Sequence, residues 1–154
     1  MTPKQMDALL EMKEKMDVIE LQYKYVRSVD ERDWKMSAGL FHEDAQLYVT
    51  ESGKKRLIGG KPEIEAFYQE ISERDFIFAR HFITNPVVKI DGHHASFTSY
   101  YNTMFMHDTF TKVIFGFYDD KLVKADSQWW FTEKNIIMGW NDLLVPVKEF
   151  KIKG

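Results

Sequence analysis

The feature that most constrains the fold is a change of hydrophobic period near residue 76. Before it, apolar residues recur at helical spacing, as in residues 2–40 and 60–72. After it, apolar and polar residues alternate, most regularly over residues 94–105. Helices followed by a run of strands are typical of α+β folds, in which helices pack on one sheet. We therefore expect a strongly curved sheet that wraps around N-terminal helices.

Local signals place the helices of the first half. The segment Thr2-Pro3-Lys4-Gln5 matches a capping box with a proline in the first turn. A second possible start at Asp17 leaves open whether one long helix or two follow. Asp33 predicts the N-cap of a short helix, and Gly60 precedes another.

The second half predicts an antiparallel meander. Asp91-Gly92 is a strong hairpin signal. Further turns are expected at Ser52-Gly53 and Asp126-Ser127. After a first strand over residues 45–50, long strands are expected over residues 76–90, 94–105, 113–124 and 128–140.

Composition narrows the functional classes. The chain holds 21 basic and 24 acidic residues, and its net charge of -3 offers nucleic acid or an anionic membrane no electrostatic attraction. It has no cysteine, which excludes disulfides, thiolate nucleophiles and cysteine-ligated metal centres. Aromatic residues make up 15% of the chain, enough to fill a core and still line a cavity for a small apolar molecule.

Length and hydropathy give expectations about organisation and location. The 154 residues predict a single domain over residues 1–154. The longest apolar run, residues 113–118, is too short to span a bilayer. The N-terminus has no signal-peptide core. We therefore expect a cytoplasmic protein with no membrane and no nucleic-acid partner.

The five histidines form no recognised metal motif. His93 and His94 follow a predicted turn and His42 lies in a polar segment, so all three are expected at the surface. No spacing matches a dedicated metal site. The sequence also has no phosphate loop, dinucleotide fingerprint or nucleophile elbow. We expect no metal ion and no organic cofactor.

His81 and Asp30 differ from these residues because both lie on partly apolar stripes. His81 alternates with Ile83 in a predicted strand, and Asp30 shares a helical face with Tyr23 and Val26. Each could be a structural group satisfied within the core. An acid among apolar neighbours needs a polar partner. If Asp30 accepts the ring N–H of His81, the pair forms a general base held in one tautomer.

Three blocks of sequence together resemble the SnoaL-like and scytalone-dehydratase-like family. They are residues 28–34 with 40–45, His81-x-x-x-Asn85 with residues 88–95, and residues 116–123 followed by Trp129, Trp130 and Trp140. The order and spacing of these blocks carry the resemblance. It implies the nuclear transport factor two-like, or cystatin-like, fold. In that fold a cone-shaped barrel, made by a mostly antiparallel curved sheet, closes around helices and a deep apolar pocket.

The resemblance also implies a catalytic site. In scytalone dehydratase and hexachlorocyclohexane dehydrochlorinase an Asp–His dyad removes a proton, and Asp30 and His81 occupy the matching positions. Tyr48 resembles a second, catalytic tyrosine of scytalone dehydratase. Tyr25 matches a tyrosine of the bile-acid dehydratase pattern, but at ~100° per residue a helix places it about 140° from Asp30, so this match requires the helix to end before Asp30. Val29 replaces a scytalone dehydratase tyrosine, which argues against the same substrate.

Four further residues are expected to contact the substrate. His107 lies one residue from the position of that family's second histidine, and Asn102 is the pocket-side polar candidate by strand alternation. Trp34 belongs to the first block, and Phe82 is one of the surplus aromatic residues. Both could line an apolar pocket or simply fill the core.

Two functions remain open at this stage. The first is a cofactor-independent lyase or isomerase, of dehydratase or cyclase type, that acts on an apolar oxygenated ring compound through Asp30 and His81. The second is a non-catalytic module that binds a ligand or supports an oligomer. Small subunits of ring-hydroxylating dioxygenases share this cone, and residues 80–85 resemble theirs. Because the fold commonly associates through its outer sheet face, the resemblance also implies a homodimer or homotrimer.

Overall fold

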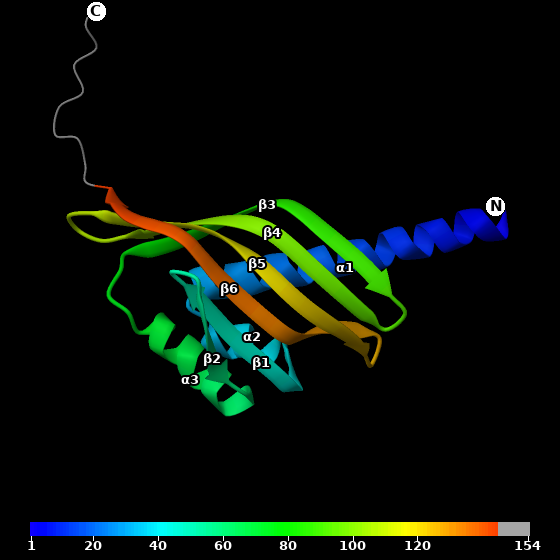
Figure 1. Ribbon diagram of the computed structural model, residues 1–154, viewed down its shortest axis with the longest axis horizontal. Helices are drawn as coiled ribbons and strands as arrows, with labels where there is room; N and C mark the ends of the chain where they lie inside the picture. The colour runs from blue at the N-terminus through cyan, green and yellow to red at the C-terminus, as the bar shows by residue number, and fades with distance from the viewer. Residues whose placement is uncertain (145–154) are drawn as a thin grey trace, which may run out of the picture.

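The computed structural model describes residues 1–144 and the side chains of residues 1–139, so the Trp140 side chain lies outside the described residues. The helix-to-strand order expected from the sequence is confirmed (Figure 1). No helix in the described part of the chain is long and apolar enough to cross a membrane. The elements are α1 (Pro3–Asp30), α2 (Trp34–Gly39), β1 (Phe41–Glu51), β2 (Lys54–Gly59), α3 (Lys61–Ser72), β3 (Phe78–Asp91), β4 (His94–Met106), β5 (Thr111–Ala125) and β6 (Gln128–Leu144).

Helix α1 is a single helix of 28 residues. The capping box forms as expected, because the Thr2 hydroxyl accepts the Gln5 N–H at 3.3 Å and the Gln5 side chain accepts the Thr2 N–H at 2.8 Å. Asp17 therefore starts no second helix. The expected apolar stripe is partly wrong, since Tyr23 is 48% exposed. The buried positions of α1 are Val18, Leu21, Gln22, Tyr25, Val26, Ser28 and Val29.

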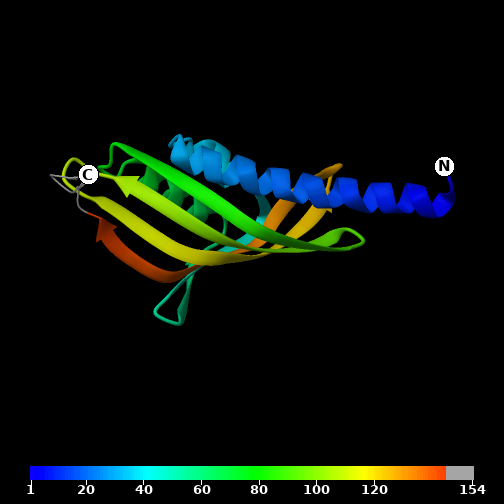
Figure 2. The same ribbon diagram turned by 90° about the horizontal axis from the view of Figure 1, so that it is seen from above.

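The six strands form one sheet in the order β2-β1-β6-β5-β4-β3. Strands β1 and β6 are parallel and every other pair is antiparallel, so the expected mostly antiparallel α+β fold is confirmed. The sheet curls around α1, whose C-terminal half packs on its concave side (Figure 2). Helix α3 packs beside α2 and against β1 and β2. The core between these layers includes Val18, Phe41, Leu47, Ile64, Phe97 and Phe131.

Two irregularities help to bend the sheet. In edge strand β3 the register shifts between Thr84 and Val87, where Asn85 adopts a φ of 55° before Pro86. In β5 the register shifts at Gly116, where an added Cβ would lie 2.0 Å from a backbone oxygen of β6. Glycine is thus required for the close approach of these two strands.

Candidate active site

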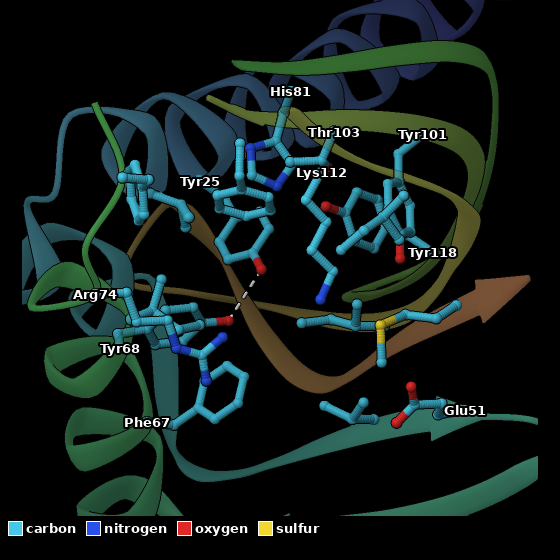
Figure 3. A pocket seen from close by; sticks show the side chains of 18 of the residues that line it. Tyr25, Glu51, Phe67, Tyr68, Arg74, His81, Tyr101, Thr103, Lys112 and Tyr118 are labelled. Carbon is cyan, nitrogen blue, oxygen red and sulfur yellow. Dashed lines mark hydrogen bonds between the residues drawn. The ribbon is translucent and has the colours of Figure 1, made fainter. Parts of the chain in front are cut away.

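A cavity of about 480 Å³ lies between the concave face of the sheet and the helices. Figure 3 shows side chains from α1, α3 and several strands directed into it. Much of its wall is apolar, and Val29, Phe67, Ile71, Phe105, Ile114 and Met138 contribute to it. A site of this size and character suits a small, mainly apolar molecule.

Asp30 and His81 meet at this cavity. Asp30 Oδ1 lies 2.6 Å from His81 Nδ1, and Asp30 Oδ2 accepts the backbone N–H of His81 at 2.9 Å. Both side chains are about nine-tenths buried. Because an ionised carboxylate only accepts hydrogen bonds, Nδ1 is the protonated nitrogen and Nε2 carries the lone pair of the neutral ring.

The end of α1 is fixed beside β3 by a second contact. Arg32, which follows the helix with a φ of 61°, donates a hydrogen bond to the Phe76 carbonyl. Its guanidinium also lies 4.1 Å from the centre of the Phe76 ring. The ring of His81 rests edge-on against Phe105 on the neighbouring strand. These contacts hold the dyad in place from both the helix and the sheet.

Four tyrosines surround the rest of the cavity. Tyr68 donates a hydrogen bond to the Tyr25 hydroxyl at 3.0 Å, and Tyr101 stacks on Tyr118 with ring centres 4.5 Å apart (Figure 3). Burial raises the pKa of all four hydroxyls above the ordinary value. They are therefore neutral at physiological pH and can donate hydrogen bonds, but they do not act as bases.

Thr103 lines the cavity on the strand next to His81. It is the direct cross-strand neighbour of His81 and is only 1% exposed. Its Oγ1 has no hydrogen-bond partner among the described residues. A buried hydroxyl without a partner is energetically costly, so a polar atom that reaches it would be stabilised.

A buried polar cluster lies behind the tyrosines. Lys134 Nζ is 2.8 Å from Asp120 and 3.2 Å from the Gln22 side-chain oxygen, and it lies about 4 Å from the ring centres of Tyr25 and Tyr118. Burial raises the pKa of the Asp120 carboxyl, and burial also lowers the pKa of the Lys134 ammonium. The cluster ties α1 to β5 and β6 beneath the cavity wall.

Half of the predicted site residues surround the cavity. His81, Tyr25 and His107 line it, and Asp30 reaches it through His81. We expected that Tyr25 and Asp30 could share the site only if the helix ended before Asp30, and this expectation is wrong. The helix runs to Asp30 while Tyr25 lines the cavity, because Asp30 needs only to reach β3.

The other four residues lie elsewhere, and their expected positions in the site are corrected. Tyr48 alternates with the inward-facing Val49, and its hydroxyl bonds to Gln46 on the exposed side of β1. Phe82 and Asn102 are cross-strand partners on the outer face of the sheet. Trp34 packs against the outside of the core cluster instead of lining the cavity.

Sequence reasoning missed several cavity residues. Thr103 could have been found from strand alternation, because it shares a face with Tyr101 once β4 is paired with β3. Arg74 follows α3 and Lys112 begins β5, so their approach to one cavity depends on the tertiary path of the chain. Among the described residues, no cluster of three or more His, Asp or Glu side chains is placed to hold a metal ion.

Comparison with protein families gives one match. The family model described as SnoaL-like domain matches residues 11–135, which is more than half of the chain. No sequence match was found among curated proteins.

Several solved structures share the fold. A protein assigned as a scytalone dehydratase from Novosphingobium aromaticivorans is 18% identical, with a TM-score of 0.73 over 94% of this chain and 97% of that one. Type 3 hexachlorocyclohexane dehydrochlorinase from Novosphingobium barchaimii is 15% identical, with a TM-score of 0.76 over 94% and 99%. The beta subunit of a protein assigned as an aromatic-ring-hydroxylating dioxygenase from N. aromaticivorans is 15% identical, with a TM-score of 0.72 over 84% and 91%. At these identities the similarity shows the fold alone.

Proposed function

The chain belongs to the SnoaL-like domain family, and on that premise we propose that it is a small-molecule lyase or isomerase whose general base is His81 oriented by Asp30. One observation carries the proposal: the 2.6 Å contact between Asp30 and His81 Nδ1 at the wall of a largely apolar cavity. The proposed substrate is an apolar, oxygenated ring compound. All the proton transfers in this proposal are made by side chains.

The orientation of His81 determines which atom reacts. Asp30 holds the Nδ1–H, so the Nε2 lone pair is the site that takes a proton from a substrate carbon. The imidazolium formed in this step is stabilised by the adjacent carboxylate. The second bond from Asp30, to the backbone N–H of His81, limits rotation of the pair.

In an elimination of water, the C–H bond breaks and Nε2–H forms. The C–H electron pair becomes the new double bond, the C–O bond breaks, and the leaving oxygen takes a proton back from Nε2 as water departs. In an isomerisation, the C–H electron pair forms a C=C bond to the carbonyl carbon, and the C=O π pair moves onto the oxygen and gives an enolate. His81 then returns the proton at a different carbon.

Neutral hydroxyls are available to stabilise the developing oxyanion. Because Tyr68 donates to Tyr25, the Tyr25 O–H remains able to donate to a substrate oxygen. The unpartnered Thr103 hydroxyl lies beside His81 and could hold the carbonyl or leaving oxygen. Tyr25 and Thr103 are thus the proposed hydrogen-bond donors to the substrate oxygen, and Tyr48, which does not line the cavity, is not.

Deuterium exchange tests whether His81 acts as a general base. It reports proton removal alone, so the leaving group of the natural substrate need not be known. The purified protein is incubated in D2O with bicyclic ketones such as 2-tetralone and 1-indanone, and incorporation next to the carbonyl is followed by mass spectrometry. Dehydration of the corresponding β-hydroxy ketones is followed by absorbance. We expect His81→Ala and Asp30→Asn to lower the rates by about 10²-fold or more. Thr103→Val should lower them less.

The control is His93→Ala, because His93 lies in the turn between β3 and β4, away from the cavity. Unchanged rates in both dyad variants, or no exchange and no turnover of any ketone by the wild type, would contradict the proposal.

The alternative function, a non-catalytic module like a dioxygenase small subunit, is less well supported. A purely oligomer-supporting module has no need for an open cavity beside a hydrogen-bonded dyad. If the protein is homogeneous only together with a larger iron-containing partner, the alternative is favoured.

A further inference from the structure

The charged side chains of the cavity are not balanced. Its lining includes the cations Arg56, Arg74 and Lys112 but one ionised acid, Glu51. The chain as a whole has a net charge of -3, so cations are enriched at the cavity against the overall charge. The other titratable lining groups are His81, His107 and the four neutral tyrosines. Among the lining side chains, cations therefore outnumber acids, which favours a bound anionic group over a cationic one.

Lys112 and Arg74 approach the cavity from different elements. Lys112 extends from the start of β5, where it is the cross-strand partner of the cavity residue Phe105. Arg74 extends from the segment that follows α3. Figure 3 shows the ammonium of Lys112 and the guanidinium of Arg74 both directed into the cavity space.

The two cations have few partners of their own. Arg74 pairs with Glu70 at 2.9 Å, but this pair is largely exposed and weakly held. Lys112 is half-buried, and no ion pair is found for it among the described residues. Removing part of the hydration of an ammonium without supplying an anion is unfavourable. A bound anion would supply the missing partner.

We propose that the substrate is an amphipathic anion, whose anionic group is bound by Lys112 and Arg74 while its apolar ring extends toward His81. The Arg74 guanidinium, whose Nη2 also bonds to Glu70, has further N–H donors that match a carboxylate, and the Lys112 ammonium adds a compact charge. Phe67, Ile71 and Ile114 provide apolar surface for the ring. The proposal rests on the proposed function for the reacting end of the substrate, but not for binding of the anionic end.

Glu51 provides a test in which the expected change in anion affinity is opposite to that for Lys112 and Arg74. Its carboxylate lines the same cavity and repels an anion. Replacement of Glu51 by glutamine should therefore strengthen anion binding, whereas loss of Lys112 or Arg74 should weaken it. A purely structural role for these residues would not produce opposite effects on a charged ligand and no effect on a neutral one.

Ligands with the same ring but different charge show whether binding depends on the anionic group or on the shape of the ring. Binding of 2-naphthoate, 2-naphthamide and 2-naphthyl phosphate to the full chain is measured by isothermal titration calorimetry at low and high salt. We expect wild-type protein to bind naphthoate about tenfold more tightly than the amide, a difference of about 1.4 kcal/mol. Lys112→Met should remove most of this preference, Arg74→Met part of it, and salt should reduce it. The phosphate ester shows whether a phosphate can replace the carboxylate.

The control variant is Lys89→Met, which removes an exposed lysine of β3 that does not line the cavity. Its anion preference should equal that of the wild type. Equal affinity for naphthoate and naphthamide, no binding of any probe at millimolar concentration, or an unchanged preference in the Lys112→Met/Arg74→Met double variant would overturn the proposal. An intact anion preference in a protein without exchange or turnover would contradict the Asp30–His81 function alone.

Discussion

Lys134 is a fully buried cation whose charge is balanced by a single carboxylate. It and Asp120 are both 0% exposed, and Gln22 bonds to both of them. A buried ion pair gains little over apolar packing, but a buried charge that loses its partner is strongly destabilising. Single substitutions in this cluster should therefore lower the free energy of unfolding strongly.

We expect Lys134→Met and Asp120→Asn each to lower the free energy of unfolding by about 3–5 kcal/mol. The double variant should lose clearly less than the sum, because neither charge remains unpaired. Urea unfolding followed by circular dichroism measures these changes. Lys121→Met is the matched control, since Lys121 pairs with Glu133 on the same two strands but is 67% exposed, and its loss should cost no more than about 1 kcal/mol. Additive single effects would contradict the expected coupling.

At the scale of single residues, sequence motifs predicted the dyad, but they did not predict which strand residues face the cavity. The dyad could be predicted because Asp30 and His81 lie in motifs whose order the fold preserves. Phe82 was wrong for a local reason, since adjacent strand residues point to opposite faces and His81 faces the cavity. Asn102 failed for the same reason, because it is paired with Phe82. The approach of Lys112 to the cavity depends on the curvature of the sheet, which side-chain alternation alone does not specify.

At the scale of elements, Glu14 connects α1 to the far strands. Its carboxylate bonds to the ammonium of Lys124 on β5 and accepts the Trp129 indole N–H at 2.9 Å on β6. The hydrogen bond from Lys124 is the main cause that lowers the pKa of the Glu14 carboxyl below its ordinary 4.5. This contact lies where the exposed N-terminal turns of α1 meet the body of the molecule.

The lowered pKa of Glu14 gives an acid-dependent stability. Because the unfolded carboxyl binds a proton more readily, the stabilisation is complete above pH 4.5 and is lost as the pH falls through the folded-state pKa. We expect Glu14→Gln to be less stable than wild type at pH 7 and about equal to it in strong acid. Thermal unfolding across this range measures the difference. A stability difference between wild type and variant that increases toward acid pH would contradict this prediction.

The starts of the helices could be predicted from local capping signals more reliably than the number of helices. The capping box at Thr2 and the cap at Asp33, which accepts the Met36 N–H at 3.0 Å, were both predicted. Asp17 also resembles a cap, but in the continuous helix its carboxylate pairs with Lys13 instead. Local propensity could not distinguish these two uses of an aspartate. The 28-residue length of α1 is therefore known only from the structure.

At the scale of the whole molecule, two surfaces expose apolar side chains. On the outer sheet face Phe82, Tyr100 and Phe117 are 53%, 63% and 41% exposed. The N-terminal turns of α1 project past the end of the sheet and expose Leu9 and Leu10 (Figure 1). Apolar surface of this kind commonly marks contacts between proteins.

The homodimer or homotrimer expected from the sequence stays a prediction. Light scattering coupled to size-exclusion chromatography should give two or three times the 18.3 kDa chain mass. Phe82→Lys together with Tyr100→Lys should shift the mass toward the monomer without loss of helix content. A wild-type monomer mass at all concentrations would contradict the prediction.

Asp30 orients the proposed base and also holds two elements of the fold together. It receives two hydrogen bonds from one residue of an edge strand, so it fastens the end of α1 to β3 whether or not any reaction takes place. Selection for folding alone would thus retain this aspartate in a descendant that had lost its chemistry. Among relatives of this protein, the pair without an open apolar cavity beside it is consequently poor grounds for assigning catalysis, and the groups lining the pocket are the more informative characters.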